Sequence, residues 1–344
     1  MAAVLFRCDA GPAIGLGHVM RCKALACAFV ELGWQCWFAT SQETSLFVAD
    51  RAPIIVPPGI EGATAVAAAA AERRAGCVVV DHYGLDERFE RVMAEANLAV
   101  VAIDDLANRR HHCDLLVDSN PNRADADYVD LISRETRLLL GAWYAMLRPE
   151  FGTLRASVVA EPPRDVERLL ITLGGADPDN ISDRCLDALA RLGDRTWNAV
   201  LVIGPAHRKR DQLARRAASL GVDVTVDPPD IAALMARADF AVTAGGTTCL
   251  EFACLGTPAI VIMAAENQRA VSRAVGKAGA ALVLENSERF DPQQLADAIA
   301  RLAADWPQRL RMRSAGRALV DGQGAARVAN AVADLVAARQ RTFS

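Results

Sequence analysis

The residue types best suited to chemistry stand in a glycine-rich segment near the start of the chain. Asp9 to Arg21 follows an apolar run and contains Gly15, Gly17 and His18. Glycine lets the backbone turn sharply and leaves no Cβ in the path of a ligand. The positive end of a following helix attracts anions and favours the neutral imidazole, which can take a proton from water. We therefore expect His18 to act as a general base, with Gly15 and Gly17 contacting the substrate. A helix cap or a merely exposed histidine is the plainer alternative.

Arg21 stands about one helical turn beyond His18. At that spacing its guanidinium can contact a substrate phosphate or pair with an acidic side chain, and the sequence leaves both roles open. The surrounding glycines do not form the G-x-G-x-x-G pattern, and the acidic residue expected about 20 residues later for ribose binding is not evident. A nicotinamide cofactor is therefore disfavoured, and we expect no cofactor at all.

Two glycine pairs follow apolar runs in the second half of the chain. Each stands between a predicted strand and a predicted helix, an arrangement that can hold a diphosphate. After the second pair, two hydroxyl side chains can donate to phosphate, and a carboxylate one turn later can accept from ribose hydroxyls. A plain helix start with a solvated glutamate is the alternative. The predicted nucleotide-binding residues are Gly174, Gly175, Gly245, Gly246, Thr247, Thr248 and Glu251.

Other polar residues follow predicted strands. Asn267 and Gln268 come after the run 259–263 and are expected at the same sheet edge as the glycine pairs, although they would also serve as helix caps. In the first half, Asp86 and Asp105 are candidates for the site or for caps. The sequence His111-His112-Cys113-Asp114 looks like a metal motif. Adjacent residues of a strand point to opposite faces, so we predict no metal site.

These residues need a scaffold, and the hydrophobic pattern indicates its class. Short apolar runs rich in β-branched residues alternate with helical patterns from end to end, which predicts parallel sheets covered on both faces, an α/β fold. The predicted strands are 3–7, 35–39, 53–56, 77–81, 99–103, 114–117, 137–140, 168–173, 199–203, 222–226, 239–243, 259–263 and 280–284. The clearest helical patterns between them are 18–32 and 86–97.

The chain length predicts two domains, since 344 residues exceed the size at which one core keeps growing. The stretch 157–164 contains a double proline and is the expected linker. We predict Rossmann-like domains at 1–156 and 165–344, facing each other across a cleft, with His18 in the first and the predicted nucleotide-binding residues in the second. The helical segment from 292 onward would complete the second domain, its arginines forming a solvated face.

Composition limits the partners. With 38 Lys and Arg against 42 Asp and Glu, the net charge of -4 offers no basic field for nucleic acid or a membrane surface. The chain has no stretch of roughly 18 apolar residues, the length needed to span a bilayer. Its nine cysteines lack metal-binding spacing and suggest buried, reduced thiols. We expect a cytoplasmic monomer or weak oligomer that binds a small substrate.

Several segments together resemble one enzyme family, over most of residues 3 to 290. The segments are Gly15-x-Gly17-His18-x-Met20-Arg21-Cys22, Asp81-His82-Tyr83-x-Leu85-Asp86, Asp104 to Arg109, Tyr144 to Phe151, Leu173-Gly174-Gly175-x-Asp177-Pro178, and Gly245-Gly246-Thr247-Thr248 with Glu251. They are similar to the hydrolases of pseudaminic acid biosynthesis that act on UDP-2,4-diacetamido-2,4,6-trideoxy-β-L-altropyranose. The chain departs from the family at Asp118-Ser119-Asn120-Pro121, where Asp-Gln-Asn is usual, and at Lys23, where Leu is common.

The resemblance implies a GT-B fold and the release of UDP by water attack at the anomeric carbon, with inversion and without a required metal. It implies that His18 is the proton acceptor and that Glu251, with the loop at Gly245, binds the nucleotide. It also makes Tyr83 and Arg148, within shared segments, predicted substrate contacts. Two alternatives stay open: a GT-B glycosyltransferase that passes the sugar to another acceptor, and a non-catalytic protein that binds nucleotide sugars.

Overall fold

A computed structural model describes residues 2–11, 15–158, 161–193, 195–263, 265–285 and 291–342. Pro12 to Ile14 of the first glycine loop, Val159 and Ala160 of the expected linker, and Ala264 lie outside the described residues. The chain forms two compact units. The first comprises Met1–Pro149 and Gly322–Ser344, and the second comprises Glu150–Asp321.

The first unit is built on a seven-stranded sheet. Its strands are β1 (Ala3–Cys8), β2 (Gln35–Thr40), β3 (Ile54–Ile55), β4 (Cys77–Asp81), β5 (Ala99–Ile103), β6 (Leu115–Asp118) and β7 (Arg137–Leu140). They are all parallel, in the order β3-β2-β1-β4-β5-β6-β7. The order reverses direction between β1 and β4. In open α/β sheets, ligands bind at the carboxyl ends of the strands where this reversal occurs.

Helices cover both faces of this sheet. They are α1 (Gly17–Glu31), α2 (Ala63–Glu72), α3 (Glu87–Glu95) and α12 (Gly324–Thr342), with the short 3-10 helices η1 (Thr44–Arg51), η2 (Ile60–Gly62), η3 (Asp125–Asp127) and η4 (Ala142–Tyr144). Alternate residues of a strand point to opposite faces. Accordingly, Val4 and Phe6 share a core with α1 and α12, whereas Leu5 shares one with α2 and α3. Burial on both sides explains why the strands are continuously apolar.

The second unit repeats this plan with six strands. They are β8 (Arg168–Thr172), β9 (Asn198–Ile203), β10 (Asp223–Val226), β11 (Phe240–Ala244), β12 (Ala259–Ile262) and β13 (Ala281–Leu284). All are parallel, in the order β10-β9-β8-β11-β12-β13, which reverses between β8 and β11. The helices are α4 (Pro149–Ser157), α5 (Ile181–Arg191), α6 (Arg210–Ser219), α7 (Ile231–Arg237), α8 (Thr247–Leu255), η5 (Glu266–Gln268), α9 (Arg269–Lys277), α10 (Pro292–Ala304) and α11 (Trp306–Leu319).

The predicted α/β class and both parallel sheets are confirmed, and every strand in both units begins and ends within one residue of its predicted run. Within the residues that the structure describes, we find no helix with the length and apolar character needed to cross a membrane.

The predicted domain boundaries need correction at two places. The first unit ends at Pro149 rather than at 156, so α4 belongs to the second unit. There the Arg155 guanidinium donates to the carbonyls of Cys254, at 2.7 Å, and Val320, at 3.0 Å. The double proline does interrupt regular structure, but it does not determine which core the preceding helix joins.

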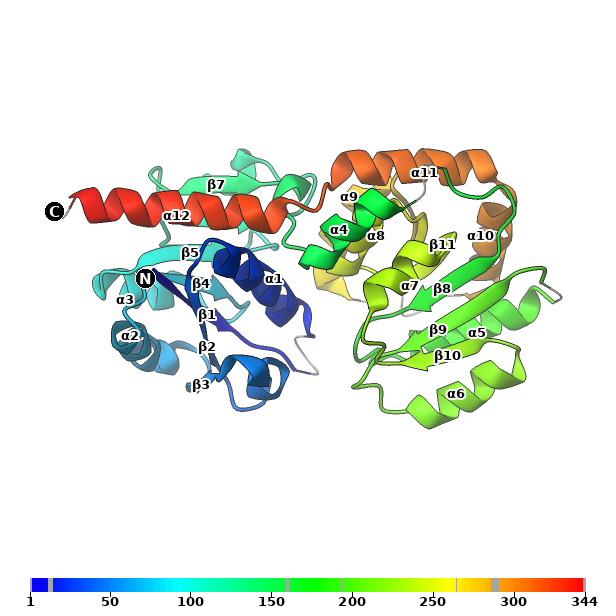
Figure 1. The fold of residues 1–344 in the computed structure, drawn as a ribbon, viewed down its shortest axis with the longest axis horizontal. Helices are drawn as coiled ribbons and strands as arrows, with labels where there is room; N and C mark the ends of the chain where they lie inside the picture. Colours follow the sequence, from blue (N-terminus) through cyan, green and yellow to red (C-terminus); the bar gives the residue numbers. More distant parts are fainter. Residues whose placement is uncertain are drawn as a thin grey trace. The chain divides into compact units, whose positions relative to one another are not determined.

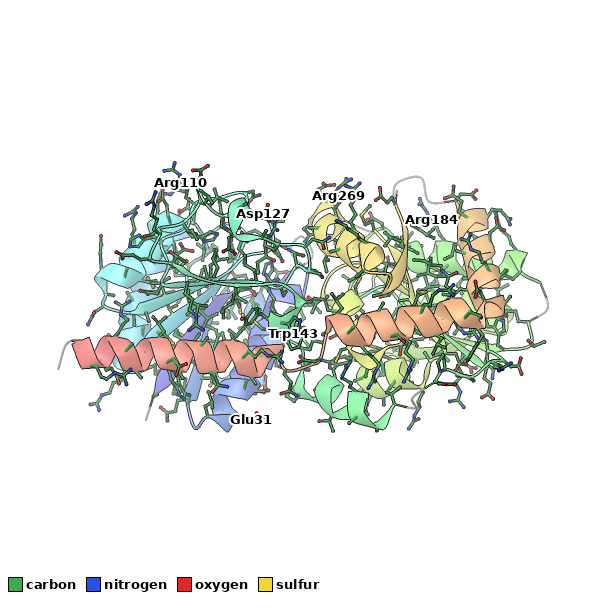
Figure 2. All side chains as sticks on the ribbon, turned by 90° about the horizontal axis from the view of Figure 1, so that it is seen from above. Glu31, Arg110, Asp127, Trp143, Arg184 and Arg269 are labelled. Atoms are coloured by element: carbon green, nitrogen blue, oxygen red, sulfur yellow. The ribbon has the colours of Figure 1, made fainter. Side chains whose placement is uncertain are left out.

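The second correction concerns α12, which was assigned to the second domain and packs on the first unit (Figure 1). Val328 and Val332 are fully buried in the same core as Phe6. At the end of the helix, the Arg339 guanidinium lies 2.8 Å from the Asp114 carboxylate. Near the start of the helix, the Arg327 guanidinium stacks on the ring of Trp143, which is labelled in Figure 2, with 4.5 Å to the ring centroid. An amphipathic pattern specifies that a helix has a buried face, not which core that face covers.

The expectation of a solvated arginine face beyond residue 292 is wrong for α11. Arg309 is fully buried and Arg313 is 5% exposed. Arg309 Nη1 donates to the Leu302 carbonyl at 2.8 Å, near the end of α10, and its Nη2 donates to the Pro163 carbonyl at 3.1 Å. Such carbonyls at helix ends and in linkers lack backbone partners, and an arginine can satisfy several of them from one buried side chain.

Candidate active site

His18 lies at the carboxyl edge of the first sheet, three residues after Gly15. Gly15 has φ +82°, a backbone conformation that favours glycine, and its N–H donates to the Gly11 carbonyl at 2.7 Å. His18 is the second residue of α1 and is only 3% exposed. Its Nδ1 lies 2.5 Å from Asp81 Oδ1, at the end of β4. A carboxylate can only accept, so Nδ1 carries the hydrogen and Nε2 is left as the basic nitrogen.

Asp81 is fully buried and holds two partners at once. Besides His18, it accepts from Arg21 Nε at 2.5 Å and from Arg21 Nη2 at 2.6 Å. Burial raises the pKa of Asp81, but the charge of Arg21 and the hydrogen bonds from Arg21 and His18 outweigh it, and the pKa lies well below the usual range. Asp81 is therefore a fixed anion behind the imidazole. This carboxylate–histidine arrangement orients the ring and stabilises its protonated form.

Arg21 pairs with acidic side chains, which is one of the two roles that the sequence left open. Its side chain is buried, and Nη1 donates to Asp105 Oδ2 at 2.7 Å in addition to the two bonds to Asp81. Burial lowers the pKa of Arg21, but Asp81 and Asp105 raise it well above its ordinary value. The guanidinium thus pairs with acids within the first unit, and contact with a substrate phosphate stays a prediction.

Tyr83 joins the same group. Its ring meets the His18 ring edge-on, with 4.4 Å between centroids, and its hydroxyl donates to Asp105 Oδ2 at 3.3 Å. Asp105 therefore belongs to the His18 group rather than to a helix cap. Asp86, for which the same two roles were open, is the N-cap of α3 and accepts from the Arg88 N–H at 3.0 Å.

Asp9, which the sequence pattern did not single out, fixes the start of the loop after β1. Asp9 Oδ1 accepts from the Ser41 N–H at 2.7 Å, and Asp9 Oδ2 accepts from Arg7 at 2.8 Å. Burial raises the pKa of Asp9, but hydrogen bonds to His82 and Arg7 lower it well below the usual range. The Thr44 hydroxyl accepts from the Ala10 N–H at 2.9 Å. These contacts tie the start of the glycine loop to the segment after β2.

In the second unit, the structure brings the loop after β11 to the segment after β12. A Cβ built on Gly245 would lie 2.7 Å from Gln268 Cβ and 2.4 Å from Ser272 Oγ, so only glycine fits there. Gly246, with φ +91°, is the N-cap of α8, and Thr247 and Thr248 are the first residues of that helix. Glu251 follows one turn later and is half-buried. Asn267 is exposed and Gln268 half-buried, both in η5.

The loop after β8 leaves the same sheet edge, because β8 and β11 are neighbours. Gly174 has φ +87°, and the Gly175 carbonyl accepts from the Ala206 N–H at 3.0 Å. Asp177 is buried and accepts from the N–H groups of Ile181 and Ser182, each at 2.8 Å, so it caps α5. Both predicted glycine pairs therefore stand at the reversal of strand order in their sheet.

Two further residues that the sequence singled out are Arg148 and His111. Arg148 is half-buried immediately before α4, and its predicted substrate contact stays a prediction. His111 is buried, with Nδ1 2.7 Å from Glu90 Oε1; burial lowers its pKa, but Asp104 and Glu90 raise it to about 9. Among the described residues, no three His, Cys, Asp or Glu side chains are grouped so that they could hold a metal ion.

The second unit also contains a hollow of about 430 Å³ that does not involve the glycine loops. Asp239 and Pro258 line it, and they directly precede β11 and β12. It therefore lies at the amino edge of the sheet, opposite the edge from which the glycine loops leave. Ligands of open α/β sheets bind at the carboxyl edge, so we base the candidate site on the loops.

Two parallel Rossmann-like sheets, each with glycine loops where the strand order reverses, define the GT-B class of fold. The crystal structure of Acinetobacter baumannii MurG has a TM-score of 0.69 to this chain, covers 97% of it and is itself covered completely (100%), at 15% identity. At that identity the likeness concerns the fold alone.

Sequence comparisons extend the likeness to nucleotide-sugar proteins. Residues 168–331 match the glycosyltransferase family 28 C-terminal domain. The chain is 27% identical to the spore coat polysaccharide biosynthesis protein SpsG of Bacillus subtilis, over 95% of this chain and 96% of that protein. It is 29% identical to the UDP-2,4-diacetamido-2,4,6-trideoxy-beta-L-altropyranose hydrolase of Campylobacter jejuni, over 52% of this chain and 62% of that enzyme. The match thus spans less than two thirds of that hydrolase.

Proposed function

We propose that this chain is a hydrolase that releases UDP from a UDP-activated diacetamido-trideoxyhexose by attack of water at the anomeric carbon, with inversion. The observation that carries the proposal is the buried pair of His18 Nδ1 and Asp81 Oδ1, 2.5 Å apart at the strand-order reversal of the first sheet. An imidazole whose Nδ1 hydrogen is held by a carboxylate presents Nε2 as a base. The similarity to the Campylobacter jejuni hydrolase supports the choice of substrate.

In the proposed step, His18 Nε2 takes a proton from water while the water oxygen bonds to C1 of the sugar. The bond between C1 and the phosphate oxygen breaks, and its electron pair leaves with UDP. The products are the free sugar, UDP and a proton held on His18. Asp81 stabilises the imidazolium that forms, because its negative charge is fixed beside Nδ1.

The proposed UDP site is in the second unit. The N–H groups at the start of α8, with the hydroxyls of Thr247 and Thr248, would donate to the diphosphate, whose negative charge grows as the C1 bond breaks. Glu251, one turn into α8, would accept from the ribose hydroxyls. The glycines at 174, 175, 245 and 246 would allow close approach of the backbone to the phosphates, and Asn267 and Gln268 would contact the sugar or the nucleotide.

A glycosyltransferase that uses the same UDP site is the second candidate. The match of residues 168–331 to a glycosyltransferase C-terminal domain favours it. The same base would then take a proton from an acceptor hydroxyl instead of from water. The choice between the two depends on which nucleophile reaches C1.

The decisive experiment incubates the pure protein with the UDP-sugar in ¹⁸O-labelled water and follows UDP and the sugar by NMR and mass spectrometry. Label at C1 of the free sugar supports the hydrolase. Release of UDP only when a second hydroxyl compound is added supports the transferase, and binding without release would reject both.

His18→Asn tests the residue that carries the mechanism. General-base catalysis contributes about 10²–10⁴-fold, so kcat should fall by that factor. The UDP affinity measured by calorimetry should stay within about twofold, because the proposed UDP site is in the other unit. A variant that keeps most of its kcat would show that His18 is not the base.

A further inference from the structure

We propose that Asp105 is a positioning residue that sets the charge of the group around His18, so that this group can accept a proton. Asp105 Oδ2 binds Arg21 Nη1 at 2.7 Å and the Tyr83 hydroxyl at 3.3 Å. It does not contact the His18 ring in the described structure, and it acts through Arg21. The catalytic consequence rests on the proposed function, whereas the charge effect on His18 does not.

The argument starts from the position of Arg21. Its Nη2 lies 3.1 Å from His18 Nδ1, so a permanent positive charge stands beside the ring that must become positive. Without Asp105, Asp81 alone would have to offset this charge, and its two oxygens already accept from Arg21 while one also holds His18. One arginine and one aspartate leave no net charge to stabilise an imidazolium.

Asp105 changes that balance. Arg21, Asp81 and ionised Asp105 together carry a net charge of -1, so the group that also includes His18 goes from -1 to 0 when His18 is protonated. Without Asp105, the same group would go from 0 to +1. In a buried setting, creating an uncompensated positive charge is unfavourable, so the protonated state would be destabilised.

Tyr83 and Cys22 also lie close to His18 or to Asp81, but neither supplies the negative charge that Asp105 carries. Tyr83 presents its ring edge to the imidazole and gives its hydroxyl hydrogen to Asp105. The Cys22 thiol, also on α1, donates to Asp81 Oδ2 at 3.6 Å, and burial raises its pKa well above its ordinary value, so it stays neutral. Among the described contacts, Asp105 is therefore the second anion of the group.

The backbone of Asp105 is fixed by hydrogen bonds from two side chains. Its backbone carbonyl accepts from Asn120 Nδ2 and from Arg123 Nη2, each at 2.9 Å. Both donors are themselves fixed by Asp118: the Asn120 N–H donates to Oδ1 at 2.8 Å, and Arg123 Nε donates to Oδ2. The segment from 118 to 123 thus fixes the backbone that carries Asp105.

The test is Asp105→Asn, which keeps the shape of the side chain and removes its charge. The His18 ring, followed by NMR with labelled histidine, should titrate about one pH unit lower than in the wild type. At neutral pH, kcat should fall about tenfold, and the acid limb of the pH–rate profile should move to lower pH by the same amount. Asp105→Glu should restore both toward the wild type.

Asp114→Asn is the matched control. Asp114 also accepts from an arginine, Arg339 at 2.8 Å, and lies in the same unit but at the amino edge of the sheet. Its variant should leave the His18 titration and the pH profile unchanged. A folded Asp105→Asn protein with an unchanged His18 titration would overturn the inference. If the wild type releases no UDP from any nucleotide sugar, the proposed function fails while the NMR titration still decides the role of Asp105.

Discussion

The chemistry at His18 depends on which of its ring nitrogens keeps a hydrogen. Asp81 decides this, because it is an acceptor only and lies 2.5 Å from Nδ1. Asp81 also anchors Arg21, so one carboxylate sets the tautomer, the ring orientation and the neighbouring charge. The position of His18 at a helix start does not by itself determine its tautomer, its orientation or its neighbouring charge. For that reason the sequence was also compatible with a histidine that only caps the helix.

Asp81→Asn should lower kcat by about 10²-fold or more, because the amide cannot stabilise the imidazolium and can favour the other tautomer. The measurement is single-turnover release of UDP. Because Arg21 would lose part of a buried ion pair, the free energy of unfolding should also fall, by about 3–5 kcal/mol. UDP binding to the second unit should persist. A folded variant with normal turnover would contradict the orienting role of Asp81.

At the scale of the elements, the candidate site is formed by loops that leave neighbouring parallel strands. Gly15 and His18 follow β1, and Asp81 ends the neighbouring strand β4; the two glycine pairs follow the neighbouring strands β8 and β11. In both sheets the strand order reverses between these neighbours, so their following helices lie on opposite faces and the loops between them are free to meet a ligand.

Gly245→Ala should weaken UDP binding by about tenfold. The added Cβ would lie 2.4 Å from Ser272 Oγ and 2.7 Å from Gln268 Cβ, so the loop or the start of α9 must move. Calorimetric titration with UDP measures the effect.

Gly221→Ala is the control for a strained glycine away from the proposed nucleotide site, since Gly221 has a left-handed φ, +63°, and precedes β10 at the amino edge. It should lower the stability of the unit without changing the UDP affinity. Equal UDP affinities for the two variants would argue against the glycine loop as the nucleotide site.

At the scale of the whole molecule, the chain passes from the first unit to the second and back again. The return places α12 in the core of the first unit, where Val328 and Val332 are fully buried. The last part of the sequence therefore stabilises the unit that carries His18, although it follows the second unit directly in sequence.

Val332→Ala should destabilise the first unit by about 2 kcal/mol, because it removes two buried methyl groups and leaves a cavity. Hydrogen exchange followed by mass spectrometry should show lost protection in α1 and β1, with little change in α10 and α11. Asn330→Ala, at an exposed position of the same helix, should leave both regions unchanged. Lost protection confined to the second unit would contradict the placement of α12.

The sequence alone determined the strands, the α/β class and the loops at Gly15, Gly174 and Gly245, because these depend on local patterns: continuous apolar runs, helix starts and glycine at turns. It also singled out His18. It did not show that Asp81 binds the His18 ring directly, or that Arg21 joins Asp81 to Asp105, although these two residues are 60 and 84 positions from Arg21 in sequence. Strand order decides which strand ends become neighbours, and that order depends on packing of the whole sheet. The place of α12 was decided in the same way, since its apolar face fits a core that only the folded first unit provides.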